Sequence, residues 1–207
     1  IISTFNRVEH LKRSVASVMN QTFKDYELII VDNASTDQTQ GFINSLTGQR
    51  ISSVRHGTNK GGPAARNTGI KLARGNFIAF LDDDDEWAPE KLERQVVLME
   101  KAPQEVGLVY VGSEIFDQRK KRIISLNRPS YRGNVYQRLL LSTVIGSVTS
   151  VMIRKECFDK TGMFDEELTS CQDWEMWLRI AQHYEFDFVP DILARINVHG
   201  KQISTNY

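Results

Sequence analysis

The sequence FIAFLDDDDE, residues 77–86, sets a run of strand-forming residues directly against five consecutive acids. The apolar half, 77–81, is short and rich in the aromatic and branched side chains that favour a buried strand. The acidic half, 82–86, follows it without an intervening turn residue. A buried strand that ends in a polar cluster is typical of α/β proteins, in which ligands bind beyond the carboxyl ends of parallel strands.

Strands and helices alternate through the first half of the chain around this stretch. Short apolar runs predict the strands, and apolar residues at helical spacing predict the helices. The expected strands are 1–5, 26–31, 51–55 and 77–81. The expected helices are 8–21, 35–46, 64–73 and 89–99. This order predicts a mainly parallel central sheet with helices on both faces and right-handed crossovers.

The second half of the chain is less regular. The expected strands are 107–116, 147–153, 186–189 and 192–196, and the expected helices are 133–141 and 173–183. A basic turn at 119–122 is expected between the first two of these strands. The fold class is therefore α/β, with an irregular C-terminal lobe in one domain over 1–207. The chain opens inside an expected strand, so we expect this sequence to be trimmed at its ends.

Composition limits the classes of function. The chain has 26 basic and 26 acidic residues and no formal net charge, which argues against a general nucleic-acid binder. Its two cysteines, Cys157 and Cys171, form no disulfide or zinc pattern and predict a reducing compartment. No apolar stretch reaches the roughly 20 residues that cross a bilayer. We expect a cytoplasmic protein, and we also consider a location at the inner face of the membrane.

Three polar clusters follow expected strands, at 3–7, 32–35 and 82–86. Because the carboxyl ends of parallel strands lie at one edge of a sheet, we expect the clusters to converge. Consecutive acids at a crowded strand end need a counter-charge, and Mg²⁺ or Mn²⁺ supplies one while leaving positions open for phosphate. The alternative is a solvated loop whose acids favour the start of the helix at 89–99.

Other motifs are weak when taken singly. Asp32 and Asn33 are placed to hydrogen-bond a nucleobase or ribose, or else form a simple turn. The segment 59–67 puts glycines and Arg66 at a helix start, which suits an anion. Asp173 is either a general base or a helix cap, and His199 taken alone is more often a surface or hydrogen-bonded histidine than a ligand.

Together these motifs resemble the family 2 glycosyltransferases, which have the Rossmann-like GT-A fold. The match lies in five motifs in the right order, covering essentially the whole chain: STFNR at 3–7, DNASTD at 32–37, NKGGPAARNTG at 59–69, FLDDDD at 80–85 and QD at 172–173. The resemblance implies a nucleotide-sugar-binding half, 1–100, and an acceptor-binding half, 101–207.

The resemblance also implies roles for individual residues on the donor side. Thr4, Phe5 and Arg7 would line the nucleotide pocket, and Asp32 or Asn33 would lie near the base. Arg66 would lie there too. Asp82 and Asp83 would bind the nucleotide sugar, with Asp83 facing the ribose.

Metal and catalytic roles follow from the same resemblance. Asp84 would bind the metal together with His199, although four aspartates in a row leave the metal ligand open by one position. Arg195 and His199 resemble a C-terminal segment that closes over the donor. Asp173 would be the base that deprotonates the acceptor hydroxyl.

The implied function is a metal-dependent hexosyltransferase of the inverting, non-processive kind. It would use Mn²⁺ or Mg²⁺ and move a sugar from a nucleotide-diphosphate sugar, a UDP-sugar by preference, to a glycan, glycolipid or other hydroxyl acceptor. Polysaccharide biosynthesis for the cell envelope, without nucleic acid as a partner, and peripheral association with a membrane would fit this class. The alternatives are a sugar-1-phosphate nucleotidyltransferase, a haloacid-dehalogenase-like phosphatase and an inactive carbohydrate-binding module.

Overall fold

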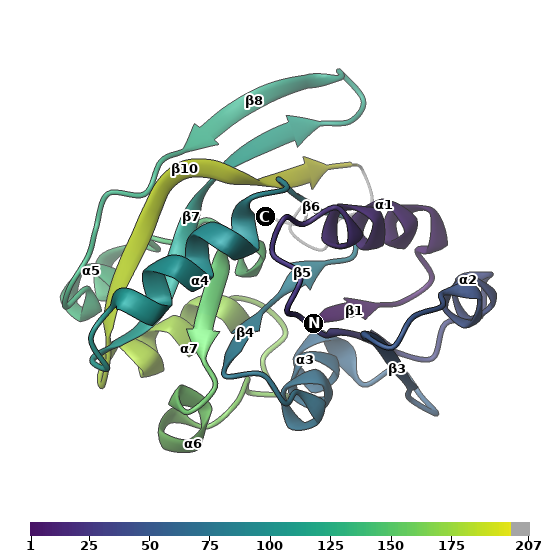
Figure 1. Cartoon of the computed structure of the whole chain (residues 1–207), viewed down its shortest axis with the longest axis horizontal. Coiled ribbons are helices and arrows are strands. Elements are labelled where there is room, and N and C mark those ends of the chain that lie inside the picture. The colour runs from purple at the N-terminus through teal and green to yellow at the C-terminus, as the bar shows by residue number, and fades with distance from the viewer. Residues whose placement is uncertain (200–207) are drawn as a thin grey trace.

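Two β-sheets meet near residue 80 in the computed structural model, which describes residues 1–199 (Figure 1). The first sheet is parallel throughout and has the strand order β3-β2-β1-β5. Its strands are β1 (Ile2–Thr4), β2 (Leu28–Asp32), β3 (Ile51–Arg55) and β5 (Leu81–Asp82). The predicted parallel sheet is therefore present.

Helices cover both faces of this sheet, and the side chains of β2 show why. Ile29 and Val31 point into one buried cluster, whereas Leu28 and Ile30 point into another, as the two-residue period of a strand requires. In Figure 1, α1 and α3 lie on opposite sides of β1. The four helices of this half are α1 (Val8–Met19), α2 (Thr39–Ser45), α3 (Gly61–Leu72) and α4 (Lys91–Lys101).

The second sheet is mixed and has the order β4-β9-β7-β10-β6, with β8 pairing with β7. β7 and β10 are parallel and the other pairs are antiparallel. Its strands are β4 (Phe77–Ala79), β6 (Glu86–Trp87), β7 (Val106–Asp117), β8 (Arg122–Asn127), β9 (Val151–Arg154) and β10 (Glu185–Val198). The remaining helices are α5 (Tyr136–Leu141), α6 (Cys157–Thr161), α7 (Gln172–Ala181) and the 3-10 helix η1 (Val148–Ser150).

The strand expected at 77–81 is divided between the two sheets. β4 pairs antiparallel with β9 in the second sheet, and β5 pairs parallel with β1 in the first. Phe80, between them, is buried edge-on against Phe158 and Phe164. The apolar run gave no indication of this division, because the choice of partner strand depends on residues far away in sequence.

The second half differs from expectation in four places, one of which is α6, a helix that was not expected. The basic turn at 119–122 leads into β8, a strand that was not expected, and not into 147–153. The segment expected as one strand at 147–153 begins as η1 and becomes β9. The two short strands expected at 186–189 and 192–196 form the continuous β10, which has register shifts against β7 between Val189 and Ala194.

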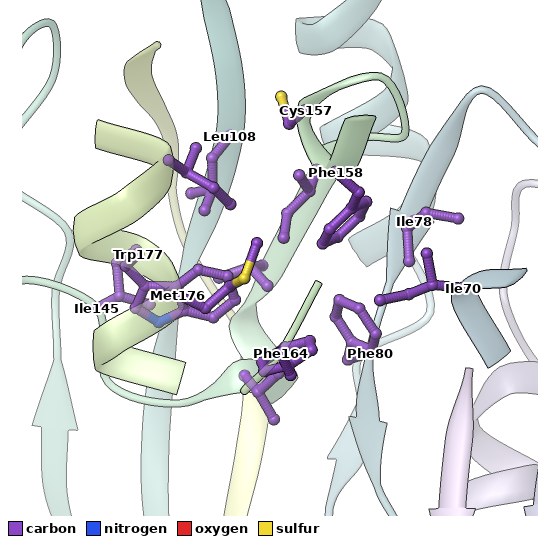
Figure 2. Packing of buried hydrophobic residues seen from close by; sticks show 14 of the residues in the cluster. Ile70, Ile78, Phe80, Leu108, Ile145, Cys157, Phe158, Phe164, Met176 and Trp177 are labelled. Carbon is purple, nitrogen blue, oxygen red and sulfur yellow. The ribbon is translucent and has the colours of Figure 1, made fainter. Parts of the chain in front are cut away.

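The apolar core of the second half forms where α6 and α7 pack on the mixed sheet. Trp177 is fully buried and lies edge-on to Phe164, while Met176 and Ile145 pack in the same cluster (Figure 2). This packing fixes α7, and with it the first turn that carries Asp173. Within residues 1–199, no helix has the length and hydropathy of a membrane-crossing segment.

Candidate active site

The carboxyl ends of β1, β2 and β5 lie side by side, as predicted. Thr4 is aligned with Asp32 on β2, and Ser3 is aligned with Asp82 on β5. The Thr4 hydroxyl donates a hydrogen bond to Oδ2 of Asp83 over 2.7 Å, so the end of β1 is tied directly to the acidic run.

Arg7 supplies a counter-charge for the acidic run. Its Nη1 lies 3.1 Å from Oδ1 of Asp83 and 3.0 Å from Oδ2 of Asp84. Burial raises the pKa of Asp83 to about 6, against the opposing effects of Arg7 and the Thr4 hydroxyl. Burial lowers the pKa of Arg7, but the two carboxylates outweigh it and the pKa is raised overall. The site thus holds its negative charge by pairing it with a cation.

Asp85 differs from its neighbours because its carboxylate is used inside the fold. Its Oδ2 accepts from the Thr149 hydroxyl at 2.6 Å, and its Oδ1 accepts from the backbone N–H of Asn197 at 2.9 Å. Burial, with the charges of Asp82 and Asp84, raises its pKa well above the usual value. Asp85 therefore joins the acidic loop to β10 and η1, and is a poor candidate for a metal ligand.

Arg66 connects the acidic run to the start of α7. Its Nη2 donates to Oδ1 of Asp82 at 2.8 Å, and its Nη1 donates to Oε1 of Gln172 at 3.2 Å. Asp173, the next residue, is half-buried and close enough for its charge to act on Asp82. The candidate base and the candidate donor site are therefore linked through one guanidinium.

Asp84 and His199 form the pair that suits a divalent cation. Oδ2 of Asp84 lies 2.9 Å from Nε2 of His199, the last residue that the structure describes. A carboxylate oxygen and an imidazole nitrogen are both ligands that Mn²⁺ accepts. Across residues 1–199 there is no group of three or more His, Cys, Asp or Glu side chains arranged for a metal. The pair fits an ion whose remaining ligands come from a bound diphosphate or from water.

Asp32 and Asn33 lie at the end of β2, next to the end of β1, and their side chains have different surroundings. Asp32 is 1% exposed, and its Oδ1 accepts from the backbone N–H of Ser35. Its Oδ2 lies 3.5 Å from Nε of Arg55 but forms no hydrogen bond with the described residues. A buried carboxylate oxygen without such a bond is uncommon in folded proteins, which makes Oδ2 of Asp32 the unsatisfied acceptor at the end of β2.

The Asn33 side chain, in contrast, is engaged within the protein. Its Nδ2 donates to Asn59 and to the Gly61 carbonyl, and its Oδ1 accepts from the backbone N–H of Lys60. Nδ1 of His56 lies 2.9 Å from the same Oδ1. These bonds hold the segment 56–61 in place, so Asn33 can shape the pocket through this loop.

Strained backbone lies next to the predicted site residues. Four non-glycine residues among 1–199 have a positive φ; Asn6 and Ala34 adjoin predicted site residues, and Cys171 precedes Gln172, the partner of Arg66. Such conformations cost of order 1–3 kcal/mol and persist where the surroundings enforce them. Asn6 shows the enforcement, because its Oδ1 accepts from the backbone N–H of Thr36 and ties the loops after β1 and β2 together.

Several residues that shape the site were not identified from the sequence. The Ser14 hydroxyl lies 2.8 Å and 2.7 Å from the carbonyl oxygens of Asp83 and Asp85. Ser14 had a detectable signal, since it is a polar residue within the apolar spacing of α1. Asn197 donates to the Asp84 carbonyl, and the His10 ring lies 4.5 Å from the His199 ring. Neither residue stands out in sequence.

Two of the residues predicted for the site, Phe5 and Arg195, form no hydrogen bond or ion pair with the acidic side chains 82–85 in the part of the chain that the structure describes. Phe5 is 40% exposed and is open to a ligand. Arg195 was expected in the segment that closes over the donor, but its Nε is paired with Glu114 at 2.6 Å and its guanidinium lies over the Phe116 ring. In this structure the Arg195 side chain thus stabilises the β7–β10 pair, and its backbone is aligned with Glu86, the last acid of the run, where β10 pairs with β6.

Sequence comparison places the chain among known transferases. The model of glycosyl transferase family 2 matches residues 1–162. A candidate colanic acid biosynthesis glycosyl transferase of Escherichia coli K12, WcaA, is 33% identical over 187 residues, which is 87% of this chain and 64% of that protein. An uncharacterized glycosyltransferase of Methanocaldococcus jannaschii is 29% identical over 97% of the chain and 70% of its own length. The chain spans only 28% of a Rickettsia bellii relative that is 30% identical.

Solved structures agree in fold. TarS 1-349 of S. aureus in complex with UDP-GlcNAc superposes with a TM-score of 0.83 at 21% identity, covering 100% of this chain and 60% of that one. The mannosyltransferase PcManGT of Pyrobaculum calidifontis, in complex with GDP-Man and Mn²⁺, gives a TM-score of 0.72 at 19% identity, covering 97% and 56%. The fold is GT-A, as predicted. With a family model matched across most of its length, the chain belongs to glycosyl transferase family 2.

Proposed function

We propose that this chain transfers a single sugar from a nucleoside diphosphate sugar to a hydroxyl acceptor, with inversion and with a divalent metal ion. The observation that carries the proposal is the cluster at the ends of β1, β2 and β5. There, Arg7 and His199 face Asp84, while Arg66 links Asp82 to the turn that holds Asp173. Cations, acids and a candidate base are all needed for this reaction.

The donor side of the proposal uses residues that are already aligned. Asp83, held by Thr4, would accept from the ribose, and Asp32 would accept from the base through its unbonded Oδ2. Phe5, which is exposed, would pack against the nucleotide. Asn33 would fix the loop around the base by its bonds to that loop.

On the catalytic side, Asp173 would accept the proton of the acceptor hydroxyl as it attacks the anomeric carbon. Asp84 and His199 would hold Mn²⁺ or Mg²⁺, which neutralises the charge on a departing diphosphate when it is bound. Arg66 would keep Asp173 and Asp82 at a fixed separation through Gln172. A base on one face and a leaving group on the other give inversion by direct displacement.

Membership of the family does not specify the substrates or the cellular location, and we propose both. UDP is the nucleotide we propose, supported by the UDP-GlcNAc complex of TarS, and GDP is the alternative supported by PcManGT. We propose a hexose donor and a glycan or glycolipid acceptor of the cell envelope, supported by the name of the Escherichia coli relative. We place the reaction in the cytoplasm, with peripheral association at the membrane.

The direct test is release of nucleoside diphosphate from a panel of UDP- and GDP-sugars, with Mn²⁺ and with a chelator. We expect turnover with one nucleotide class, dependent on metal. Asp173→Asn should bind the donor as the wild type does and lower transfer by roughly 10²- to 10⁴-fold, the usual contribution of a general base.

A matched substitution, Asp165→Asn, changes an exposed acid before α7 and should leave the rate unchanged. Near-normal transfer by Asp173→Asn would remove Asp173 from the base role. Absence of turnover and of donor binding across the whole panel would contradict the proposed function.

A further inference from the structure

The β7–β8 hairpin carries an exposed apolar strand that the catalytic proposal does not use. All ten residues from 119 to 128 are exposed, and β8 pairs with β7 alone among the described strands. Ile123, Ile124 and Leu126 are 47%, 48% and 48% exposed. In Figure 1 this hairpin forms the outer edge of the second sheet. Three large apolar side chains exposed to water on one six-residue strand indicate a surface that binds a partner.

The turn of the same hairpin is strongly cationic in a protein with no net charge. Residues 117–128 include five basic side chains and one acid, Asp117. Asp117 lies 3.7 Å from Nζ of Lys120. Arg119, Lys121 and Arg122 form no ion pair within the part of the chain that the structure describes. The positive charge at the tip is therefore available to an external partner.

We propose that the β7–β8 hairpin, residues 117–128, is a docking surface for an anionic lipid bilayer. The basic turn would attract the anionic headgroups, at about 1 kcal/mol per Lys or Arg near the surface. Ile123, Ile124 and Leu126 would then insert their side chains at the boundary between headgroups and acyl chains. Cations and apolar residues adjacent in one hairpin match the two chemistries of that surface.

The surface is joined to the catalytic cluster. The backbone N–H of Gln118 donates to the Val198 carbonyl, and Val198 precedes His199, the partner of Asp84. Docking of the hairpin would thus hold the donor site close to the headgroups. This consequence rests on the proposed function, because an acceptor carried on a lipid would then lie within reach of Asp173.

Charge favours a bilayer over the other occupants of an edge strand. A second copy of the chain would bring the same cationic hairpin, which repels its own kind. A polynucleotide would bind the cations through its phosphates, but it would leave the three aliphatic side chains beside them in water. An anionic bilayer satisfies both halves of the surface.

The test is sedimentation of the full chain with vesicles, without donor or metal. We expect binding to vesicles that contain phosphatidylglycerol and phosphatidylcholine, little binding to phosphatidylcholine alone, and a fall in binding as salt increases. The double variant Arg119→Gln with Arg122→Gln should weaken binding roughly 30-fold, because each lost charge of about 1 kcal/mol lowers the affinity slightly more than about fivefold. Ile123→Ser with Ile124→Ser should weaken it at low and high salt alike.

The matched control is Lys71→Gln with Lys101→Gln, which removes two exposed charges from helices elsewhere and should bind as the wild type does. Wild-type protein that fails to bind anionic vesicles, or binding that survives both hairpin variants, would overturn the proposal. Self-association in sedimentation velocity that Ile123→Ser with Ile124→Ser abolishes would assign the surface to a second copy. Because vesicle binding requires no turnover, its failure is distinct from failure of the transferase proposal.

Discussion

Asp85 and Asp84 are adjacent and identical in type, but their surroundings give them different chemistry. Asp85 is bonded to Thr149 and to the backbone of Asn197, whereas Asp84 faces Arg7 and His199. The sequence located the site at this run of acids but left the metal ligand open by one position. The distinction depends on η1 and β10, which approach from more than 60 residues away.

The two cysteines differ in the same way, and this leads to a prediction about reactivity. Burial raises the pKa of Cys157 to about 12, while Cys171 is exposed. Since the thiolate is the reactive form, we expect Ellman's reagent to modify one thiol per folded chain, at Cys171, and both in denaturant. Cys171→Ser should abolish the fast reaction. Two thiols reacting equally fast in the folded protein would contradict this placement of Cys157.

At the scale of elements, the sequence predicted the repeated strands and helices of the first half well. The clearest of those strands, β2, lies in a contiguous apolar run, and its neighbours β1 and β3 belong to the same sheet. The division of 77–81 between two sheets could not be predicted, because the partners of β4 and β5 are β9 and β1. β8 was not predicted, because its six residues are all exposed and its adjacent isoleucines, Ile123 and Ile124, interrupt the alternation of apolar and polar side chains.

The packing of β7 against α6 is tested by a glycine. A Cβ on Gly107 would lie 2.7 Å from Sγ of Cys157 and 2.7 Å from Cβ of Tyr184. Gly107→Ala should therefore lower the free energy of unfolding by about 1–3 kcal/mol in urea denaturation. Gly57→Ala is the matched control, since no atom of residues 1–199 lies within 4 Å of its added Cβ. Equal stability of the two variants would show that β7 does not pack there as described.

A buried lysine on α4 gives a prediction about pH. Nζ of Lys91 donates to Oε1 of Gln95 at 2.7 Å and lies 4.1 Å from the centre of the Trp87 ring. Burial lowers the pKa of Lys91 well below its usual value. Between that lowered pKa and about 10.5, the unfolded chain binds a proton that the folded chain does not, so the folded state gains stability as pH rises.

Urea denaturation at about pH 7 and about pH 10 compares the wild type with Lys91→Met over this window. The wild type should gain up to about 1.4 kcal/mol per pH unit relative to the variant. Parallel pH dependence in the two proteins would mean that Lys91 remains charged in the fold.

For the whole molecule, the predicted convergence of strand ends is confirmed: Thr4 donates to Asp83, and Arg7 is paired with both Asp83 and Asp84. Parallel strands impose that convergence, so alternation of elements was enough to predict it. The path by which α7 reaches the site was not predictable in this way. It depends on Trp177 and Phe164 packing in the second core, and on the link from Arg66 to Gln172.

Metal-dependent donor binding is tested most directly by calorimetric titration of UDP, and in parallel GDP, into the wild type and Asp84→Ala, with Mn²⁺ and with a chelator. The wild type should bind at least one of the two nucleotides more tightly with Mn²⁺ than with the chelator, because the metal neutralises the diphosphate. Asp84→Ala should bind equally weakly in both conditions, while Asp25→Ala, an exposed acid at the other end of β2, should behave as the wild type does. Mn²⁺-dependent affinity that persists in Asp84→Ala would contradict the assignment of the metal to this acid.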